Sequence, residues 1–579
     1  MLRRTLLLTA AVVWLCGAAQ AIDYTYTGGG TVVQNGSDYE TQFTDTANWN
    51  PTLTWPGTTA DTYTIATYLP GPTFMRPDNE VYLPDPGSGN TVYFGSITVD
   101  NGQLMLPSGA AGTYEFAGNF TVNDSGNTDG RFQRAGGGDI TFHMTQGNFF
   151  QGNRSNVMSR LTVLMSDDCG TGVTYENNGY TEDYNITKKI IVDNDATVNF
   201  AGSGNTAREI EIWGTATGQI CLPVLTSGGV HVMGSDTSGL DVIIYSYGVH
   251  DGPFQLTGTF DDVDYSGKAW HSSLGPIRQE RIAHMQGNLT CSSLDIGISG
   301  GGPNDAGWIT YMLDTDNDYI GSSNLTVNGD LNVGGTTVGR RINGALLANA
   351  STVQIAGNAT FRDTTSNHIQ NGYITATTAQ ISVGGNWSVD NAAAAAASGW
   401  DLGTSTVTFN GSGTQVIDAG RGVAFANLVI NQTGSTVQLD DNVEVTGDLT
   451  FLSDSDVVFT NETDAWIMKG GNNSEGAAQL IDLVTGVDLI SLSIEPLNPP
   501  SYVKLMSDLV LEDNLNIGLD CKLYLNGYTV SLDGQQLSAG PWDQGEIVAG
   551  GVIPEPATML LLGTGLLGAL GVARRRRMR

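Results

Sequence analysis

A Gly-Asn or Gly-Asp dipeptide recurs along this chain, and each copy is followed by a short segment in which apolar and polar residues alternate. The copies begin at Gly118, Gly147, Gly287, Gly329, Gly357, Gly385 and Gly447. Three of the intervals between neighbouring copies are 29, 28 and 28 residues, and a fixed period in the twenties is typical of solenoids. Glycine allows the positive φ of a tight corner, and Asn or Asp tolerates the neighbouring turn. The repeat therefore predicts a stack of coils, although abundant Gly and Asn also produce such intervals by chance.

Short strands account for the rest of the body. Runs rich in Val, Ile, Thr, Phe and Tyr are separated by Gly, Asn, Asp and Ser, as at residues 91–99, 189–193, 196–200 and 406–409. Each run alternates apolar and polar positions, as a strand with one buried face does. Charged residues form only 15% of the chain and glycine contributes 76 of its 579 residues, which argues against a helix-rich fold. We therefore predict an all-β chain with a parallel β-helix or β-solenoid body.

The N-terminus has the pattern of a secretory signal peptide. Arg3 and Arg4 precede an apolar run over residues 5–15, and Ala19 and Ala21 form a small-residue cleavage site. The alternative is an uncleaved membrane anchor, but the apolar run is short and ends at that cleavage site. Residues 1–21 are therefore predicted to direct export.

The C-terminus has the pattern of a short membrane anchor. Apolar residues fill positions 559–573 and five arginines follow within 574–579. Fifteen helical residues span about 22 Å, which is short for a hydrocarbon core of about 30 Å but sufficient with flanking residues. The arginines keep that end cytoplasmic, so the body is predicted to lie outside.

This C-terminus also resembles the PEP-CTERM sorting signal of Gram-negative bacteria, in which Pro-Glu-Pro precedes a short transmembrane helix and an arginine cluster. The resemblance implies recognition by an exosortase, a membrane transpeptidase-like enzyme that sorts the protein and removes the tail. It also implies an association with exopolysaccharide and delivery to the surface or matrix. The matching residues are Pro554, Glu555, Pro556, Arg574, Arg575, Arg576 and Arg577.

Removing the two ends makes the chain more acidic. The whole chain has a formal charge of −34, and residues 1–21 and 554–579 hold seven of its 25 basic and one of its 59 acidic residues. The remaining body therefore carries 18 basic and 58 acidic residues, a formal charge of −40. Nucleic acid and anionic lipid need a basic face. We predict no nucleic-acid partner, and membrane contact only through the C-terminal helix.

The body also resembles known bacterial surface proteins. The segment 425–451 looks like the coils of large parallel β-helices, and residues 45–51 with 61–65 resemble the opening of autotransporter-like passenger repeats. Residues 150–280 show no clean period, which leaves irregular coils, insertions or a separate sandwich module open. The predicted parts are a signal peptide at 1–21, an N-terminal capping β region at 22–110, solenoid repeats at 111–495, C-terminal strands at 496–545, a linker at 546–553 and the sorting signal at 554–579.

Three groups of residues are candidates for metal or redox sites. Cys169, Cys221, Cys291 and Cys521 form no C-x-x-C motif, and the sequence leaves disulfides and buried thiols equally open. Asp314, Asp316 and Asp318 alternate as in a calcium loop, but position six is Tyr319 instead of Gly and position twelve is Leu325 instead of Glu. Asp261, Asp262 and Asp264 are a further acidic group that is open to the same two interpretations, a calcium loop or an ordinary acidic turn. We predict no cofactor, with weak Ca²⁺ binding or ordinary acidic turns as the alternatives.

No catalytic motif is present in the sequence. The chain has no G-x-S-x-G, H-E-x-x-H or P-loop pattern, and His231, His250, His271 and His284 show no nucleophile motif. Five tryptophans are able either to stack on sugars or to fill a solenoid core. They are Trp49, Trp55, Trp387, Trp400 and Trp466.

These features predict an exported, non-enzymatic surface or matrix protein with a structural or adhesive role. We expect it to use the secretion machinery and an exosortase, to be held in the inner membrane before sorting, and to meet exopolysaccharide or other surface proteins afterwards. The alternative is a β-helix protein that binds or cleaves polysaccharide.

Overall fold

A computed structural model describes the backbone of residues 23–26, 33–35, 38–42, 49–50 and 62–65 and most of residues 79–549, with side chains from Val81 onward. The described part divides into two compact units. The first comprises residues up to Thr352 together with Arg362–Tyr373, and the second comprises Val353–Phe361 and the residues from Ile374. Gaps between 79 and 549 fall at 101, 124–129, 135–137, 153–156, 167–172, 178–185, 194–195, 202–204, 206, 225–229, 247–251, 266–278, 286, 298–308, 318–320, 335–341, 364–371, 392–399, 421–422, 433, 462–463, 471–477 and 497–500.

The first unit consists of short strands and one 3-10 turn, η2 (Met158–Arg160). Its strands are β1 (Asp23–Tyr26), β2 (Val33–Asn35), β3 (Asp38–Gln42), β4 (Trp49–Asn50), β5 (Thr62–Ile65), β6 (Asn79–Tyr82), β7 (Thr91–Phe94), β8 (Ser96–Val99), β9 (Gly102–Leu106), β10 (Gly112–Phe116), β11 (Phe120–Val122), β12 (Gly130–Arg134), β13 (Ile140–Met144), β14 (Asn148–Gln151), β15 (Leu161–Met165), β16 (Val173–Asn177), β17 (Lys189–Val192), β18 (Thr197–Phe200), β19 (Glu209–Val224), β20 (Val230–Ser246), β21 (Gly252–Thr257), β22 (Thr259–Tyr265), β23 (Gln279–Met285), β24 (Leu289–Ile296), β25 (Ile309–Asp314), β26 (Asp316–Asn317), β27 (Gly321–Ser322), β28 (Leu325–Val327), β29 (Leu331–Val333) and β30 (Ile342–Asn349).

Three strands contain residues of both units, and the remaining strands belong to the second unit. The shared strands are β31 (Thr352–Ile355), β32 (Ala359–Asp363) and β33 (Gly372–Ala376). The second unit continues with β34 (Gln380–Val383), β35 (Trp387–Asn391), β36 (Thr406–Phe409), β37 (Gln415–Asp418), β38 (Ala424–Phe425), β39 (Asn427–Ile430), β40 (Thr436–Leu439), β41 (Val443–Val445), β42 (Leu449–Phe451), β43 (Asp456–Phe459), β44 (Trp466–Met468), β45 (Gln479–Leu483), β46 (Leu489–Ile494), β47 (Tyr502–Leu505), β48 (Leu509–Ile517), β49 (Lys522–Tyr524), β50 (Val530–Leu532), β51 (Gln535–Gln536), β52 (Gly540–Trp542) and β53 (Gly545–Val548).

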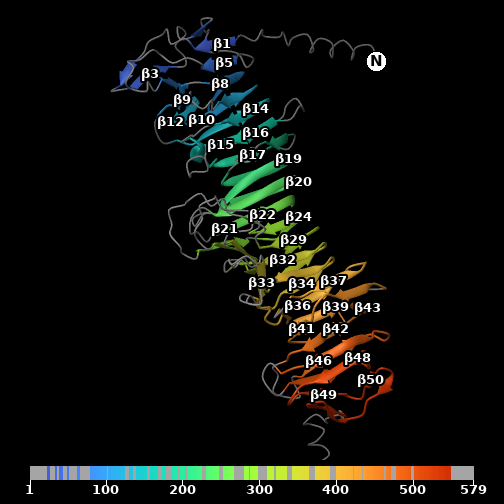
Figure 1. Cartoon of the computed structure of the whole chain (residues 1–579). Coiled ribbons are helices and arrows are strands. Elements are labelled where there is room, and N and C mark those ends of the chain that lie inside the picture. Colours follow the sequence, from blue (N-terminus) through green and yellow to red (C-terminus); the bar gives the residue numbers. More distant parts are fainter. Residues whose placement is uncertain are drawn as a thin grey trace, which may run out of the picture. The chain divides into compact units, whose positions relative to one another are not determined.

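Strands of the first unit stack in parallel, each coil placing a strand beside the equivalent strand of the coil before it (Figure 1). One series runs β7-β10-β13-β15-β17-β19 and a second runs β5-β8-β11-β14-β16-β18. The stack continues through β20, β22 and β24, so the described strands between residues 150 and 280 are parallel coils. The all-β, parallel prediction is confirmed, and the arrangement fits a solenoid.

The second unit stacks in the same way and ends in two antiparallel hairpins. Parallel series run β36-β39-β42-β45-β47-β49 and β38-β41-β44-β46-β48-β50. Hairpins β50-β51 and β52-β53 follow. Asp533 and Gly534 both have positive φ, 47° and 72°, which is the conformation of a type I′ turn. Strand β46 precedes the prolines near 496–500 and pairs in parallel with β48, which follows them. These final strands therefore belong to the stack and form no separate module.

Aromatic and aliphatic side chains fill the interior. In the strand series, alternate residues are buried, as in the pattern buried-intermediate-buried of β13 and β15. Phe142 lies among the rings of Tyr114, Phe116, Phe120 and Phe149, with a centroid distance of 4.9 Å to Phe120. Each inward position therefore forms a column of side chains along the stack, and these columns are the hydrophobic core.

The repeated dipeptides mark the corners, as predicted. The strands β11, β14, β24, β29, β32, β35 and β42 begin at the Asn or Asp of a dipeptide or at the residue after it. The side-chain oxygen of that residue accepts the backbone N–H of the next coil: Asn119 from Asn148 at 2.7 Å, and Asn358 from Asn386 at 2.8 Å. Asn386 in turn accepts from Val416 at 2.8 Å. The repeat thus encodes a polar ladder that joins consecutive coils.

At most copies of the dipeptide, the glycine is required for a reason other than the predicted positive φ. Gly147 and Gly287 have positive φ, 78° and 116°. Gly385 and Gly329 do not; instead, a Cβ at Gly385 would lie 2.5 Å from the Gly357 carbonyl, and one at Gly329 would lie 2.5 Å from the Ser292 carbonyl. The expectation that a corner φ explains every glycine is wrong, because close approach of the neighbouring coil is the commoner constraint.

One predicted strand is divided in two. Residues 91–99 form β7 and β8, with a corner at Gly95 between them. The apolar positions are Val92 and Phe94 before the corner and Ile97 and Val99 after it, so the alternation shifts by one residue at Gly95, which the prediction of a single strand overlooked. Among the described residues, no helix has the length and apolar character needed to cross a membrane.

Candidate ligand-binding face of the first unit

The residues predicted to direct export and sorting lie outside the described part of the chain. They are Ala19, Ala21, Pro554, Glu555, Pro556, Arg574, Arg575, Arg576 and Arg577.

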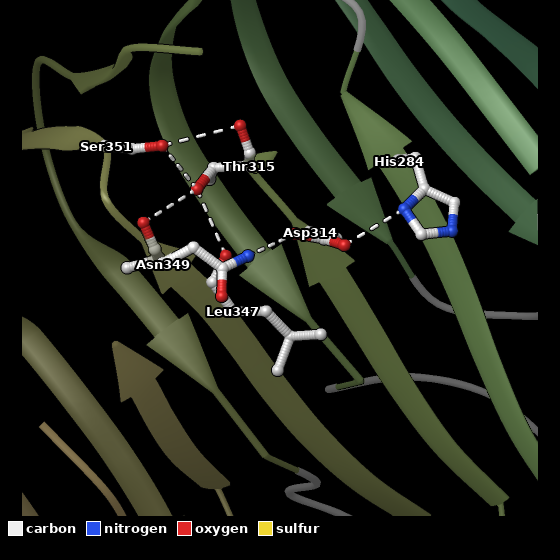
Figure 2. A network of polar contacts seen from close by, with 7 residues as sticks. His284, Asp314, Thr315, Leu347, Asn349 and Ser351 are labelled. Atoms are coloured by element: carbon white, nitrogen blue, oxygen red, sulfur yellow. Dashed lines mark hydrogen bonds and ion pairs between the residues drawn. The ribbon is translucent and has the colours of Figure 1, made fainter. Parts of the chain in front are cut away.

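Asp314, the first acid of the calcium-like sequence, belongs to a hydrogen-bonded network between coils (Figure 2). One of its carboxylate oxygens lies 3.0 Å from Nδ1 of His284, and the other accepts a hydrogen bond from the Asn349 amide at 2.7 Å. Asp316 belongs to the short hairpin β26-β27, and Asp318 lies outside the described residues. Both oxygens of Asp314 are thus engaged by side chains of neighbouring coils.

Thr315 closes the same network from the next position. Its hydroxyl lies 2.8 Å from the Ser351 hydroxyl and 3.0 Å from the Leu347 carbonyl, as Figure 2 shows. Thr315 and Ser351 are buried. Buried hydroxyls that form hydrogen bonds with one another and with a carbonyl fix the position of a corner. We therefore interpret this network as a structural link between coils.

A second group of acids follows the outward face of β22. Asp264 is in register with Asp295, and Asp295 with Asn332, whose amide donates to the Asp295 carboxylate at 2.9 Å. Burial raises the pKa of Asp295 above its usual value, and the charges of Asp262 and Asp330 add to this. In the described part of the chain, no three His, Cys, Asp or Glu side chains are grouped so that they could hold a metal ion.

Two of the four cysteines are described with their side chains. Cys291 and Cys521 are both buried and neither is in a disulfide. Burial raises the pKa of the Cys291 thiol to about 12, which keeps it protonated and unreactive at neutral pH. These two residues are therefore packing residues.

The described candidate tryptophans fit the second of the two interpretations, in which they fill the core. Trp387 and Trp466 are fully buried. Trp400 packs against Phe361 with a centroid distance of 4.8 Å and is half-buried. The side chains of Trp49 and Trp55 are outside the described residues. The described candidates therefore belong to the core and are not available to a ligand.

Two other aromatic side chains point outward from the first unit. Tyr93 is 49% exposed and Trp213 is 52% exposed, the highest values among the described aromatic residues. Tyr93 is in register with Glu115, which starts a column that continues through His143, Leu164 and Ile191 to Glu211. Trp213 shares the phase of Glu211 and lies at the edge of the same face, where β19 passes from pairing with β17 at Ile212 to pairing with β18 at Thr215. We call this face, on β7, β10, β13, β15, β17 and β19, the outer face.

Fixed polar groups occupy the middle of the outer face. Nε2 of His143 lies 2.7 Å from the Ser166 hydroxyl, and its Nδ1 lies 3.4 Å from the Glu115 carboxylate. The Lys189 ammonium donates to Glu209 at 2.7 Å and to Glu211 at 2.5 Å. Burial lowers the pKa of Lys189, but the hydrogen bonds and charges of the two glutamates outweigh it and raise the pKa above its usual value. Each cluster ties neighbouring coils together and holds its own side chains in place.

The Ser166-His143-Glu115 cluster has the order of residues seen in nucleophilic catalysis. An acyl-transfer site also needs free N–H groups aimed at the developing oxyanion. The backbone N–H groups of Thr145, Ser166 and Asp193 donate within the sheet, to Phe116, Met144 and Met165, so these three are not free for that purpose. Residues 167–172, which follow Ser166, lie outside the described part.

The comparisons with known proteins concern the C-terminal end. A family model for the PEP-CTERM protein-sorting motif matches residues 552–577. The chain carries a PEP-CTERM sorting signal. This motif implies an exported protein that an exosortase sorts. No curated protein and no solved structure matches this PEP-CTERM protein, so the likeness of its body to autotransporter passengers stays a prediction.

The exposed aromatics of the PEP-CTERM protein were missed among its candidate residues. The signal was present at Glu209-Ile-Glu-Ile-Trp213, where the tryptophan shares the phase of two glutamates and must therefore point outward with them. Tyr93 carried a weaker signal: it shares the phase of Thr91, but the three successive apolar residues Val92, Tyr93 and Phe94 leave only that one polar neighbour to mark the outward side.

Proposed function

We propose that this protein is an exported, non-enzymatic component of the cell surface or extracellular matrix, with a structural or adhesive role. A signal peptide directs its secretion, its C-terminal helix holds it in the inner membrane, and an exosortase sorts it from there. The observation that carries the proposal is the sorting motif at residues 552–577, which directly follows the last strand of a body of stacked parallel coils.

The construction of the body supports a structural role. In the described part of the body, coils are joined by parallel strand pairing, and several are also joined by polar ladder residues such as Asn386 and Asn427. A repetitive stack offers the same surface groups again and again along its length, which suits contact with a repetitive polymer. The acidic composition supports solubility outside the cell.

The non-enzymatic part of the proposal is tested at Ser166. Because the described N–H groups of Thr145, Ser166 and Asp193 are used within the sheet, we expect no labelling by a fluorophosphonate probe and no release of products from polysaccharide or ester substrates. Labelling of the wild-type protein that disappears in Ser166→Ala would favour the polysaccharide-cleaving or esterase alternative and would overturn this part.

The sorting part is tested by replacing Pro554, Glu555 and Pro556 with alanine. We expect the variant to stay in the inner membrane at the mass of the full tail, while the wild-type protein reaches the surface at a lower mass. Cell fractionation with mass spectrometry of the intact protein gives both readouts.

The matched control is the double variant Glu512→Ala with Pro541→Ala, which removes one carboxylate and one proline from exposed positions of the body. It should be sorted like the wild type. If the Pro-Glu-Pro variant matches the wild type in both location and mass, the sorting claim is wrong.

A further inference from the structure

The outer face of the first unit places two exposed aromatic rings at a defined separation. Going from Tyr93 to Trp213 takes five strand pairings, from β7 to β19. With strands about 4.8 Å apart, the two side chains are about 24 Å apart along the stack. Most other described aromatics are interior, and these two rings are more exposed than Tyr528, the other ring among the exposed large side chains.

A column of threonine hydroxyls runs between these ends. Thr91, Thr113, Thr141 and Thr162 are in register on four consecutive coils, and all four are half-buried. The column is followed by Lys189, which is in register with Thr162. The outer face therefore offers a row of hydroxyls beside the column that holds Glu115 and His143.

The neighbouring column contains both apolar and charged groups. Leu164 and Ile191 are half-buried and lie between the Glu115-His143 pair and Glu211. An apolar surface and an aromatic ring suit the C–H faces of a sugar, while carboxylates and hydroxyls accept and donate hydrogen bonds to its hydroxyl groups. Because the polar groups are held by neighbouring side chains, little of their motion remains to be lost on binding.

The charge of the outer face selects among polysaccharides. Lys189 is compensated by both Glu209 and Glu211, and Glu115 adds a further negative charge. The body as a whole has a formal charge of −40. A polyanionic chain would be repelled by this field. An uncharged chain avoids the repulsion and still uses every group on the face.

We infer that the outer face between Tyr93 and Trp213 binds a neutral, hydroxyl-rich polysaccharide that runs along the stack. The coil spacing of about 4.8 Å is comparable with the length of one sugar unit in an extended chain, so successive sugars meet equivalent positions on successive coils. The inference rests on the proposed adhesive role and names its ligand class.

The test is affinity electrophoresis of the full exported protein in native gels that contain polysaccharide. The neutral probes are hydroxyethyl cellulose, dextran, galactomannan and laminarin, and the anionic probe is polygalacturonate. We expect retardation by at least one neutral probe and none by polygalacturonate. Tyr93→Ala and Trp213→Ala should each weaken the apparent affinity about 2- to 10-fold, the range expected for loss of one ring contact, and the double variant should abolish retardation.

Two controls separate a binding role from a folding role. Tyr528→Ala removes another exposed ring, 37% exposed, from the second unit and should bind like the wild type. Trp213→Phe keeps a ring and should keep most of the affinity. All variants should unfold at the wild-type temperature.

Three results would overturn the inference: no retardation by any neutral probe, retardation by polygalacturonate alone, or equal losses in the Tyr528→Ala and Trp213→Ala variants. Retardation that is unchanged in the double variant would place binding elsewhere and would overturn it too. Sorting of these variants is measured in parallel. If they reach the surface normally but the face does not bind, the ligand is wrong while the proposed export and sorting stand.

Discussion

The two units build the same kind of coil with different interiors. In the first unit the buried columns are rich in aromatic rings, including Phe120, Phe142, Phe149 and Tyr175, with Phe149 and Tyr175 stacked at 5.0 Å. In the second unit the columns are mainly aliphatic, with a smaller ring cluster around Trp387, and buried amides such as Gln415 and Gln479 join the corners, as Asn205 does in the first unit. The comparison teaches that register between coils comes from two separable sources, ring packing inside and polar ladders at the turns.

The amides of the second unit illustrate the second source. The side chain of Gln479 donates to the carbonyls of Gly447 at 2.7 Å and Val445 at 3.1 Å, and Gln415 donates to the Val383 carbonyl at 3.1 Å. Asn427 accepts the N–H of Asp448 at 3.0 Å and donates to Thr404 at 3.0 Å. These bonds satisfy corner groups that strand pairing leaves open.

The largest effect is expected for a ring at the centre of the first unit. Phe142→Ala should lower the free energy of unfolding by about 3–5 kcal/mol, because the ring is fully buried and contacts several other rings. Urea unfolding followed by near-ultraviolet circular dichroism measures this. Tyr93→Ala is the exposed aromatic control and should change stability by less than about 0.5 kcal/mol. A loss below about 1 kcal/mol for Phe142→Ala would show that the rings do not set the core.

A smaller loss is expected for a corner glycine of the second unit. Gly385→Ala should cost about 1–3 kcal/mol, because its Cβ would lie 2.5 Å from the Gly357 backbone and the coils would have to separate locally. Gly413→Ala is the matched control, since a Cβ there meets no atom within 4 Å. Thermal unfolding of the two variants provides the comparison, and equal midpoints would contradict close approach as the reason for the repeat glycine.

The polar ladder should matter more in the second unit than in the first. Asn427→Ala removes an acceptor and a donor at once and should cost about 1–2 kcal/mol. Asn148→Ala removes an exposed bond of 3.2 Å to the N–H of Thr174 and should cost less than about 1 kcal/mol. Chemical denaturation of both variants tests this order. A larger loss for Asn148→Ala would reverse the proposed difference between the units.

The smallest effects are expected from pH, and they have opposite signs in the two units. Burial raises the pKa of Asp295, so its ionised form destabilises the fold at neutral pH, and stability is gained as the pH falls through this raised pKa. Hydrogen bonds from the Thr529 backbone and hydroxyl lower the pKa of Asp508, so its stabilisation is lost as the pH falls through the lowered value.

Two asparagine variants test these signs. Asp295→Asn should be slightly more stable than the wild type at pH 7, with the difference shrinking in mild acid. Asp508→Asn should be slightly less stable at pH 7, with its difference shrinking at lower pH. Unfolding midpoints measured from pH 3 to pH 8 would contradict the assignment if both differences had the same sign.

Much of the fold was predictable from the sequence, because the strands and corners of a solenoid are determined by short, local residue patterns. The dipeptides at Gly357 and Gly385 mark real corners, and alternation in 406–409 marks a real strand. The corner at Gly95 was missed although the apolar positions change phase there, from Val92 and Phe94 to Ile97 and Val99. The local sequence of a strand does not show which strands it pairs with. The contact of Asp314 with His284, 30 residues away, is therefore visible only in the structure.

The candidate site was less predictable than the fold. The tryptophans were candidates for sugar stacking on the basis of residue type alone, and Trp387 and Trp466 are core residues. The outward ring of Trp213 was visible only through its phase with Glu209 and Glu211, and its relation to Tyr93 depends on five successive registers that no local pattern contains.

The central claim, parallel coils in register, is tested most directly by cysteine pairs on the outer face. Thr113 and Thr141 are partners on adjacent coils, while Thr113 and Thr162 are two coils apart. Adjacent Cα atoms at about 4.8 Å fall within disulfide range and a separation of about 9.6 Å does not. The account predicts that Thr113→Cys with Thr141→Cys forms a disulfide under mild oxidation and that Thr113→Cys with Thr162→Cys does not. Bonding in the second pair without the first would contradict it.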